Sequence, residues 1–340
     1  MNNLKKLGLT ALAGSLAVTG ANATEYAVTG DAVIKYASID APASAQTLNG
    51  KGVGVDTDLY FNASGELDNG FTVAFFQAAN TDSSWSNSSS QVTVGMGSLG
   101  TLKINNVAGA AGNGIDDVMP AAYNETWDGL ALAGDNPSFF GSSTASGSLT
   151  YSIPAQELMG VTVNASLDYD PAADVGSTTA GGVNVSSVVG TAMVLKIDHE
   201  SGLSIGGGVE SIENGGTKSA TSTGNDEDNI TAYVKYSAGP ISVGYQEAYQ
   251  NSANGAADNE ADFWAVAYAA DNFSISYGES TLANHQLAGS TVVERQNESI
   301  QATYTMGAMT LGAALSETGN AGGSAGKKYE ETELSVSFAF

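Results

Sequence analysis

The sequence predicts an all-β protein: a transmembrane, antiparallel, up-and-down β-barrel of about sixteen strands. Polar and apolar residues alternate with a period of two along many segments, which is typical of strands that show one face to lipid and the other to water. Beyond residue 23 there is no apolar run of about eighteen residues, so no membrane-spanning helix is expected. The last segment, 331–340, alternates in the same way and ends on Phe340. Closure into a barrel would leave this strand no exposed edge.

The composition limits the classes of function that need to be considered. The 340 residues include 36 acidic and 11 basic side chains, a formal net charge of −25 at pH 7. Such a chain has no basic surface for nucleic acid, and nucleic acid is excluded as a partner. The absence of cysteine excludes disulfides, thiolate metal sites and a cysteine nucleophile. Because 42% of the residues are hydrophobic and only 14% are charged, the acidity does not indicate disorder.

The N-terminal residues predict a signal peptide over residues 1–23. Lys5 and Lys6 form a short positive region, an apolar stretch then runs to Val18, and Ala21 and Ala23 make a small-x-small cleavage site. An uncleaved anchor is the alternative, but the apolar stretch is too short to span a bilayer. We therefore expect an exported protein. Residues 24–340 show no linker or shift in composition and are expected to form one barrel domain.

The first predicted strand has the dimensions of a membrane crossing. From Tyr26 to Tyr36 every second residue is nonpolar or aromatic. The ten residues that separate the two tyrosines span about 33 Å along a strand, or roughly 25 Å once the strand is tilted. That is the height of the apolar band of a membrane barrel, with an aromatic ring at each rim. Phe338 and Phe340 lie on the apolar face of the last strand and complete the predicted aromatic girdle.

Strands and connections follow a regular rhythm along the chain. The expected strands are 26–36, 53–67, 71–79, 91–97, 101–107, 147–153, 161–170, 187–198, 203–213, 230–237, 241–250, 262–269, 273–279, 298–306, 309–315 and 329–340. The short connections are 68–70, 98–100, 154–160, 200–202, 238–240, 270–272 and 307–308. Every second connection is short, so we expect all short turns at one end of the barrel and all long loops at the other.

The third long connection, about 108–146, breaks this rhythm because it is too long for an ordinary structureless loop. It contains several carboxylates and large aromatic residues, among them Trp127, Phe139 and Phe140. Aromatic side chains in a loop need a surface to pack against. Folding of the loop into the barrel lumen would provide that surface.

These features together resemble the Gram-negative general diffusion porins, in particular the alphaproteobacterial type. The resemblance depends on the strand count, the glycine-rich turn at 95–102 and the oversized acidic third loop, and it covers essentially the whole mature chain. It implies an outer-membrane location, passive diffusion of small hydrophilic solutes and a homotrimer embedded in outer-membrane lipid. It also implies that the last strand, ending at Phe340, is recognised by the barrel-assembly machinery.

In that family the third loop narrows the pore and faces a basic cluster on the opposite wall. The resemblance therefore implies four acidic constriction residues: Asp116, Asp117, Glu125 and Asp128. This chain departs from the family pattern because its one arginine, Arg295, is expected in a late external loop.

The charges expected on the lumen face of the wall are mostly acidic. Strand parity places four lysines there: Lys35, Lys103, Lys196 and Lys235. The same parity places five carboxylates beside them: Asp56, Asp58, Asp168, Glu331 and Glu333. A lumen with excess carboxylate concentrates cations, so the sequence predicts a pore with weak to moderate cation selectivity.

Two channel types and two other classes of function stay open at this point. A substrate-selective channel is the alternative within transport, and an outer-membrane hydrolase or an adhesin are the alternatives outside it. No catalytic residues are expected, since His199, at a short turn, and His285, in the seventh long loop, belong to no recognisable motif. The spacing Gly95-x-Gly97-x-x-Gly100 matches a dinucleotide fingerprint but leads into a strand rather than a helix.

No cofactor or metal is expected. The acidic clusters at 226–228 and 258–262 could bind calcium through carboxylate oxygens, but they lack a spaced calcium-loop pattern. Solvated loop carboxylates are the simpler interpretation of both.

Overall fold

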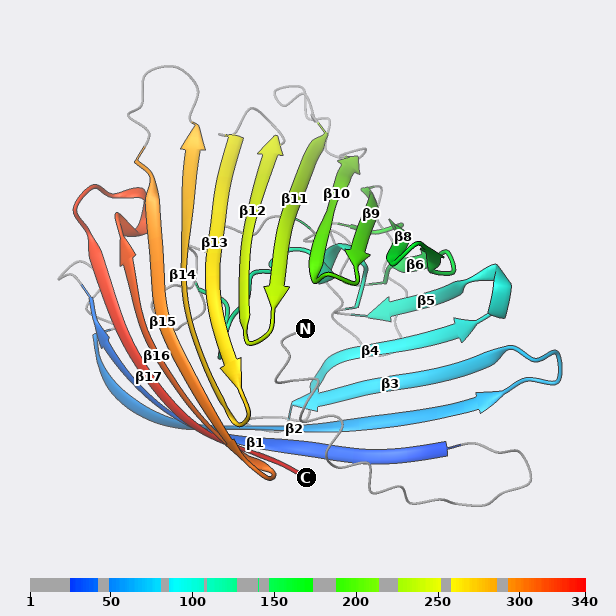
Figure 1. Ribbon diagram of the computed structural model, residues 1–340, viewed down its shortest axis with the longest axis horizontal. Coiled ribbons are helices and arrows are strands. Elements are labelled where there is room, and N and C mark those ends of the chain that lie inside the picture. The colour runs from blue at the N-terminus through cyan, green and yellow to red at the C-terminus, as the bar shows by residue number, and fades with distance from the viewer. Residues whose placement is uncertain are drawn as a thin grey trace.

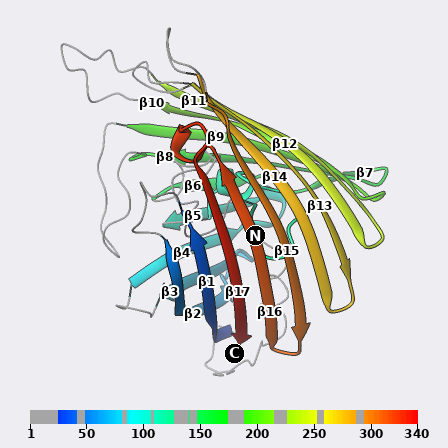
Figure 2. The ribbon, with the colours of Figure 1, turned by 90° about the vertical axis from the view of Figure 1, so that its left-hand side faces the viewer.

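Strands of the computed structural model form one closed antiparallel sheet (Figures 1 and 2). The structure describes residues 25–41, 49–80, 86–106, 109–126, 140, 147–173, 188–213, 226–251, 258–285 and 293–340. The strands are β1 (Glu25–Asp40), β2 (Gly50–Glu66), β3 (Thr72–Asn80), β4 (Ser86–Gly95), β5 (Thr101–Asn106), β6 (Leu149–Ser152), β7 (Gln156–Leu158), β8 (Val161–Asp170), β9 (Val189–His199), β10 (Leu203–Glu213), β11 (Glu227–Ala238), β12 (Ile241–Asn251), β13 (Asp258–Ala270), β14 (Phe273–His285), β15 (Arg295–Met306), β16 (Met309–Gly319) and β17 (Lys328–Ala339). Within this part of the chain no helix is long and apolar enough to cross a membrane.

The wall has sixteen strand positions, which confirms the predicted number. β6 and β7 both pair with β8, and β6 also pairs with β5, so the two short strands share one position in the wall. The segment between them contains Pro154, which has no N–H to donate to a strand ladder. The predicted strand 147–153 thus corresponds to β6, whereas β7 lies within 154–160, where the sequence predicts a short connection.

The barrel closes between its first and last strands, which lie side by side in Figure 2. The β1–β17 register runs from Asp31 opposite Ala339 to Asp40 opposite Glu330. Every other strand pairs with its neighbours along the chain, as an up-and-down barrel requires. The predicted fold class is therefore confirmed.

The two faces of the wall follow the predicted alternation. In β17, Leu334 is 50% exposed on the outer face, whereas Glu333 on the inner face is 6% exposed. The register carries this division across the seam, because Ile34 lies opposite Val336 and Lys35 lies opposite Ser335. Apolar side chains thus cover the outside and polar side chains line the lumen, as expected of a barrel that stands in lipid.

Six of the seven predicted short connections join consecutive strands as expected, and in the seventh, 154–160, the turn is reduced to Met159 and Gly160 after β7 (Figure 1). Most need a residue with positive φ, as tight hairpins do. Asp271 supplies it at φ 49° in the β13–β14 turn, and Gly202 at φ 94° in the β9–β10 turn. At Gly202 a Cβ atom would also collide with the carbonyl oxygen of Ser237, so only glycine fits there.

Several strands extend further toward the long loops than the sequence predicted. β13 begins at Asp258 rather than at residue 262, and β16 ends at Gly319 rather than at residue 315. The expected loop positions of Arg295 and His285 were therefore wrong: they are the first residue of β15 and the last of β14. In these extensions the regular apolar alternation of the outer face stops, as at Asp258 and Glu260 of β13, but the backbone pairing continues.

Candidate functional site: the lumen and its inward loop

Residues 109–126 form a segment that lies inside the barrel and is fixed to the inner wall, and it is called the inward loop below. Its first attachment is to Asp168 on β8. The backbone N–H groups of Ala111 and Gly112 donate to the two carboxylate oxygens at 3.0 and 2.8 Å. The hydroxyl of Thr150 donates to the same carboxylate. Asp168 is only 3% exposed, so it fixes the loop rather than meeting solute.

Gln246 on β12 makes the second attachment. Its Oε1 accepts from the N–H of Val118 at 3.1 Å. Its Nε2 donates to the carbonyls of Ile115 and Asp116 at 2.9 and 3.0 Å. The side chain is fully buried between wall and loop.

Gln301 on β15 makes the third attachment in the same manner. Its Oε1 accepts from the N–H groups of Tyr123 and Asn124 at 3.1 and 2.9 Å. Its Nε2 donates to the carbonyl of Glu125 at 3.4 Å. Two glutamines on separate strands therefore each bind both a donor and an acceptor of the loop backbone.

The inward loop reaches as far as β17. The hydroxyl of Tyr123 donates to Glu333, whose carboxylate lies 3.8 Å from the Nζ of Lys35. Burial raises the pKa of the Tyr123 phenol, and its hydrogen bond with Glu333 raises it further. The phenol therefore stays protonated and remains a donor at neutral pH.

Apolar contacts fill the space between the loop and β9–β11. Ile115 and Phe140 are buried against Val194 and Tyr233 of the wall. Phe140 is thus packed as the sequence predicted for an aromatic residue of this connection, while Trp127 and Phe139 lie outside the described residues. The loop consequently covers the wall from β8 to β17. At its start it also meets β4, where the Nε2 of Gln91 donates to the carbonyl of Gly109 at 3.4 Å, and it leaves β1–β3 facing the open lumen.

Three of the four constriction candidates lie on the inward loop. Asp116, Asp117 and Glu125 are half-buried there. The N–H of Met119 donates to a carboxylate oxygen of Asp117 at 2.7 Å. Asp128 lies outside the described residues.

The four predicted lumen lysines have different surroundings. Lys196 donates to the carbonyl of Gly114 at 3.1 Å, and Lys235 donates to that of Val118 at 3.4 Å, so both contact the inward loop. Lys35 lies near Glu333. Lys103 lies on β5, directly opposite Thr93 and Thr150 on the neighbouring strands.

The predicted wall carboxylates fall into two groups. Asp56 and Asp58 lie on β2, in the part of the wall that the inward loop leaves open, and both are half-exposed. Glu331 and Glu333 of β17 are 5% and 6% exposed. Like Asp168, they are buried groups of the wall rather than open pore-lining groups.

Sequence reasoning missed three residues of this site. Asp31 of β1 accepts from the hydroxyl of Tyr60 at 2.8 Å and lies directly opposite Asp58 in the register, which extends the acidic patch of the open wall. Its parity with Lys35 could have revealed it. Gln246 and Gln301 carry no charge and belong to no motif, so only the path of the loop identifies them.

The four residues predicted for an aromatic girdle lie on the outer face. Tyr26 and Phe340 are 42% and 59% exposed there, and Tyr36 and Phe338 are half-buried.

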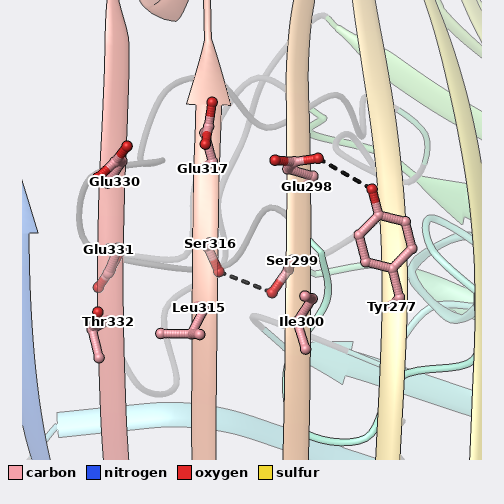
Figure 3. Close-up of a pocket in the computed structure, with 10 residues that line it drawn as sticks. All are labelled: Tyr277, Glu298, Ser299, Ile300, Leu315, Ser316, Glu317, Glu330, Glu331 and Thr332. Carbon is pink, nitrogen blue, oxygen red and sulfur yellow. Dashed lines mark hydrogen bonds between the residues drawn. The ribbon is translucent and has the colours of Figure 1, made fainter.

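Figure 3 shows a further feature on β14–β17: a row formed by Tyr277, Glu298, Glu317 and Glu330 lies above Ile300 and Leu315. Tyr277 donates to Glu298 at 3.1 Å. Lys328 lies 2.7 Å from both Glu317 and Glu330.

The acidic clusters that the sequence offered for calcium do not gather into one site. In β11, Glu227 and Asp228 alternate between the inner and outer faces. In β13, residues 258, 260 and 262 share the outer face but are spread along the strand. In the described part of the chain no group of three or more histidines, aspartates or glutamates could hold a metal ion.

A closed sixteen-position barrel, apolar outside and polar inside, with a loop fixed in its lumen, is the architecture of a membrane channel. The family described as Gram-negative porin matches residues 8–286, and the chain belongs to that family. It is an outer-membrane protein, and its family and fold point to a channel rather than to an enzyme. No curated protein sequence matches it.

Solved structures share this fold at low sequence identity. A porin refined at 1.8 Å resolution has a TM-score of 0.64 at 14% identity, covering 93% of this chain and 100% of its own. OmpT of Vibrio cholerae without loop L8 has a TM-score of 0.67 at 12% identity, covering 94% and 100%. Salmonella typhi OmpF in complex with daunomycin has a TM-score of 0.62 at 11% identity, covering 93% and 98%.

Proposed function

We propose that this porin is a passive diffusion channel for small hydrophilic solutes and that it favours cations. The observation that carries the proposal is the position of the carboxylates. Asp116, Asp117 and Glu125 lie on the inward loop, and Asp56 and Asp58 lie on the part of the wall that the loop leaves open. Carboxylates on both sides of a water-filled passage concentrate cations within a Debye length of about 8 Å.

The basic side chains do not balance these carboxylates across the passage. The resemblance implied a basic cluster opposite the acidic loop, whereas Lys196 and Lys235 contact the loop itself. The other two predicted lumen lysines, Lys35 and Lys103, lie on β1 and β5. The electric field across the pore, between an acidic and a basic side, is therefore weak. The excess of carboxylates then determines the preference for cations.

The direct test is the reversal potential of the purified protein in a planar bilayer across a tenfold KCl gradient. We expect a potential of the sign that K⁺ permeation produces. A potential of the opposite sign would contradict the proposed preference. Liposome swelling tests passive diffusion separately, and we expect rates that fall smoothly with solute size and do not saturate with concentration.

A substrate-selective channel remains the second candidate, favoured by the stacked pair of Tyr60 and Phe76 on the lumen face of β2 and β3. Their ring centroids are 6.2 Å apart at 17°. Exposed aromatic faces in a polar channel can hold a planar or ring-shaped solute. Saturating uptake of one solute, lost in Phe76→Ala, would favour this function.

We further propose a homotrimer. The outer face of β1–β3 carries mainly apolar and small residues, including Val28, Ile34 and Val55, whereas the outer face of β14–β17 carries the acidic row of Figure 3. The uncharged side is the better surface for a neighbouring barrel. An OmpT structure of Vibrio cholerae is described as a trimer form. Chemical cross-linking in detergent tests the proposal, with a three-subunit band as the expected product.

A further inference from the structure

The inward loop has a backbone that regular structure does not satisfy. Within 109–126 the structure contains one short 3-10 turn, Gly112–Gly114, and no strand. Such a segment must obtain hydrogen bonds for its N–H and C=O groups from side chains or water. In a water-filled lumen, water alone would leave the loop without a defined position. Side chains of the wall must therefore define where it lies.

Gln246 is built to do this because its amide can point only one way. The hydroxyl of Thr231 donates to the carbonyl of Glu247 at 3.0 Å, so its oxygen accepts from the Nε2 of Gln246 at 2.9 Å. That contact identifies the nitrogen and leaves Oε1 for the N–H of Val118. The wall thus orients the amide before the loop meets it.

Gln301 is oriented by the wall in a similar way. Its Nε2 donates to the hydroxyl of Ser299 at 3.1 Å, and Ser299 is linked to Ser316 on the next strand at 2.9 Å. The side chain is 3% exposed. Its Oε1 then accepts from two successive loop N–H groups, those of Tyr123 and Asn124.

Four glycines leave room for the loop to come this close. They face the lumen on alternate strands: Gly208 on β10, Gly244 on β12, Gly278 on β14 and Gly312 on β16. A Cβ at Gly208 would lie 2.9 Å from Ile115, and one at Gly244 would lie 3.0 Å from Met119. At Gly312 it would lie 2.7 Å from the ring of Tyr123, and at Gly278 it would meet the hydroxyl of Thr126.

We propose that Gln246 and Gln301 are positioning residues of the channel. They set its ion selectivity by fixing the acidic parts of the inward loop against the wall, on the surface that the four glycines leave free. Gln246 holds the carbonyl of Asp116, and Gln301 holds that of Glu125. This inference rests on the proposed cation preference, because it assigns the position of the loop carboxylates to these two amides.

The test uses Gln246→Glu and Gln301→Glu. A carboxylate has the size of the amide and still accepts from the loop N–H groups, but it cannot donate to the loop carbonyls. At neutral pH we expect the loop to detach, single-channel conductance to rise and the cation-to-anion permeability ratio to fall. When acid protonates the new carboxyl group it regains a donor. The variants should then return to the conductance of the wild-type protein measured at the same pH.

Asn62→Asp is the matched control for added charge. Asn62 faces the lumen on β2, where the inward loop is not attached. Its replacement adds the same negative charge without touching the loop, so the permeability ratio should rise. The two glutamine variants and this control are therefore expected to move the ratio in opposite directions. A rise of the ratio in Gln246→Glu and Gln301→Glu, equal to that of the control, would overturn the proposal.

Loop position is measured separately with a thiol. The chain has no cysteine, so Ala121→Cys introduces one reporter between the two attachments. We expect methanethiosulfonate labelling to become about tenfold faster in the glutamine variants than in the parent. Unchanged labelling in folded, heat-modifiable barrels would overturn the positioning role. Faster labelling with an unchanged permeability ratio would support the positioning role. It would overturn the claim that the position of the loop carboxylates sets the ion selectivity.

Discussion

The backbone N–H of Phe340 donates to the carbonyl of Gly30 at 2.8 Å, and the N–H of Gly30 donates back to the carbonyl of Phe340 at 3.1 Å. Phe340 therefore completes the seam of the barrel. Deletion of Phe340 removes this pair of hydrogen bonds at an edge that must face lipid. Unpaired backbone groups are costly there.

We expect the deletion to lower the fraction of folded barrel several-fold, measured as the heat-modifiable band in cold gel electrophoresis. Phe340→Ala keeps the backbone and should fold better than the deletion variant if the seam matters. If the two variants fold equally poorly, the ring rather than the seam is required, as expected for recognition by the assembly machinery.

Gly312→Ala should displace the inward loop. The added Cβ would lie 2.7 Å from the ring of Tyr123, whose hydroxyl is fixed by Glu333. Overpacking of this kind typically costs about 1–3 kcal/mol, enough to populate a displaced loop. We expect noisier and larger single-channel currents. Gly54→Ala is the control, since that lumen position has open space around it, and it should conduct like the wild-type protein.

Tyr123→Phe should reduce the change in channel conductance that we expect at alkaline pH. Burial raises the pKa of the Tyr123 phenol when the loop is bound to the wall. The phenol therefore holds its proton to higher pH in the bound loop than in a detached loop. Docking is therefore fully stabilised below about pH 10, and this stabilisation is lost as pH rises above it. Wild-type conductance should rise at strongly alkaline pH. In Tyr123→Phe we expect a higher conductance at pH 7 and a smaller change with pH.

Neutralisation of the open wall should weaken the proposed cation preference. Asp56→Asn with Asp58→Asn removes two carboxylates from the side of the passage opposite the loop. The reversal potential in a KCl gradient should move toward zero, and the shift should shrink as salt rises and screening increases. Glu298→Gln removes a carboxylate from the outer face and should leave the potential unchanged. An equal shift in both would mean that the lumen charges do not act locally.

Alternation along the strands was enough to predict the barrel, its inner and outer faces and the strand number. It could not predict that β13 begins at Asp258, because the outer face of that extension carries carboxylates in place of apolar residues while the backbone pairing continues. Charge and parity located Asp56 and Asp58. The attachments of the inward loop could not be predicted in this way, since Gln246 and Gln301 meet it more than a hundred residues away along the chain.

The attachments of the inward loop lie on a different part of the wall from the residues that face the open lumen. The amino acids of these two parts can therefore change independently. On β8–β17, the amides of Gln246 and Gln301 bind the loop backbone, and glycines leave space for the loop. Substitutions there would therefore displace the loop that narrows the pore. On the other side of the barrel, Gln91 of β4 donates to the loop carbonyl of Gly109, whereas β1–β3 lie away from these attachments. Lumen-facing residues of β1–β3 could therefore be substituted, by natural variation or by engineering. Such substitutions would change which solutes pass while the diameter of the constriction stays the same.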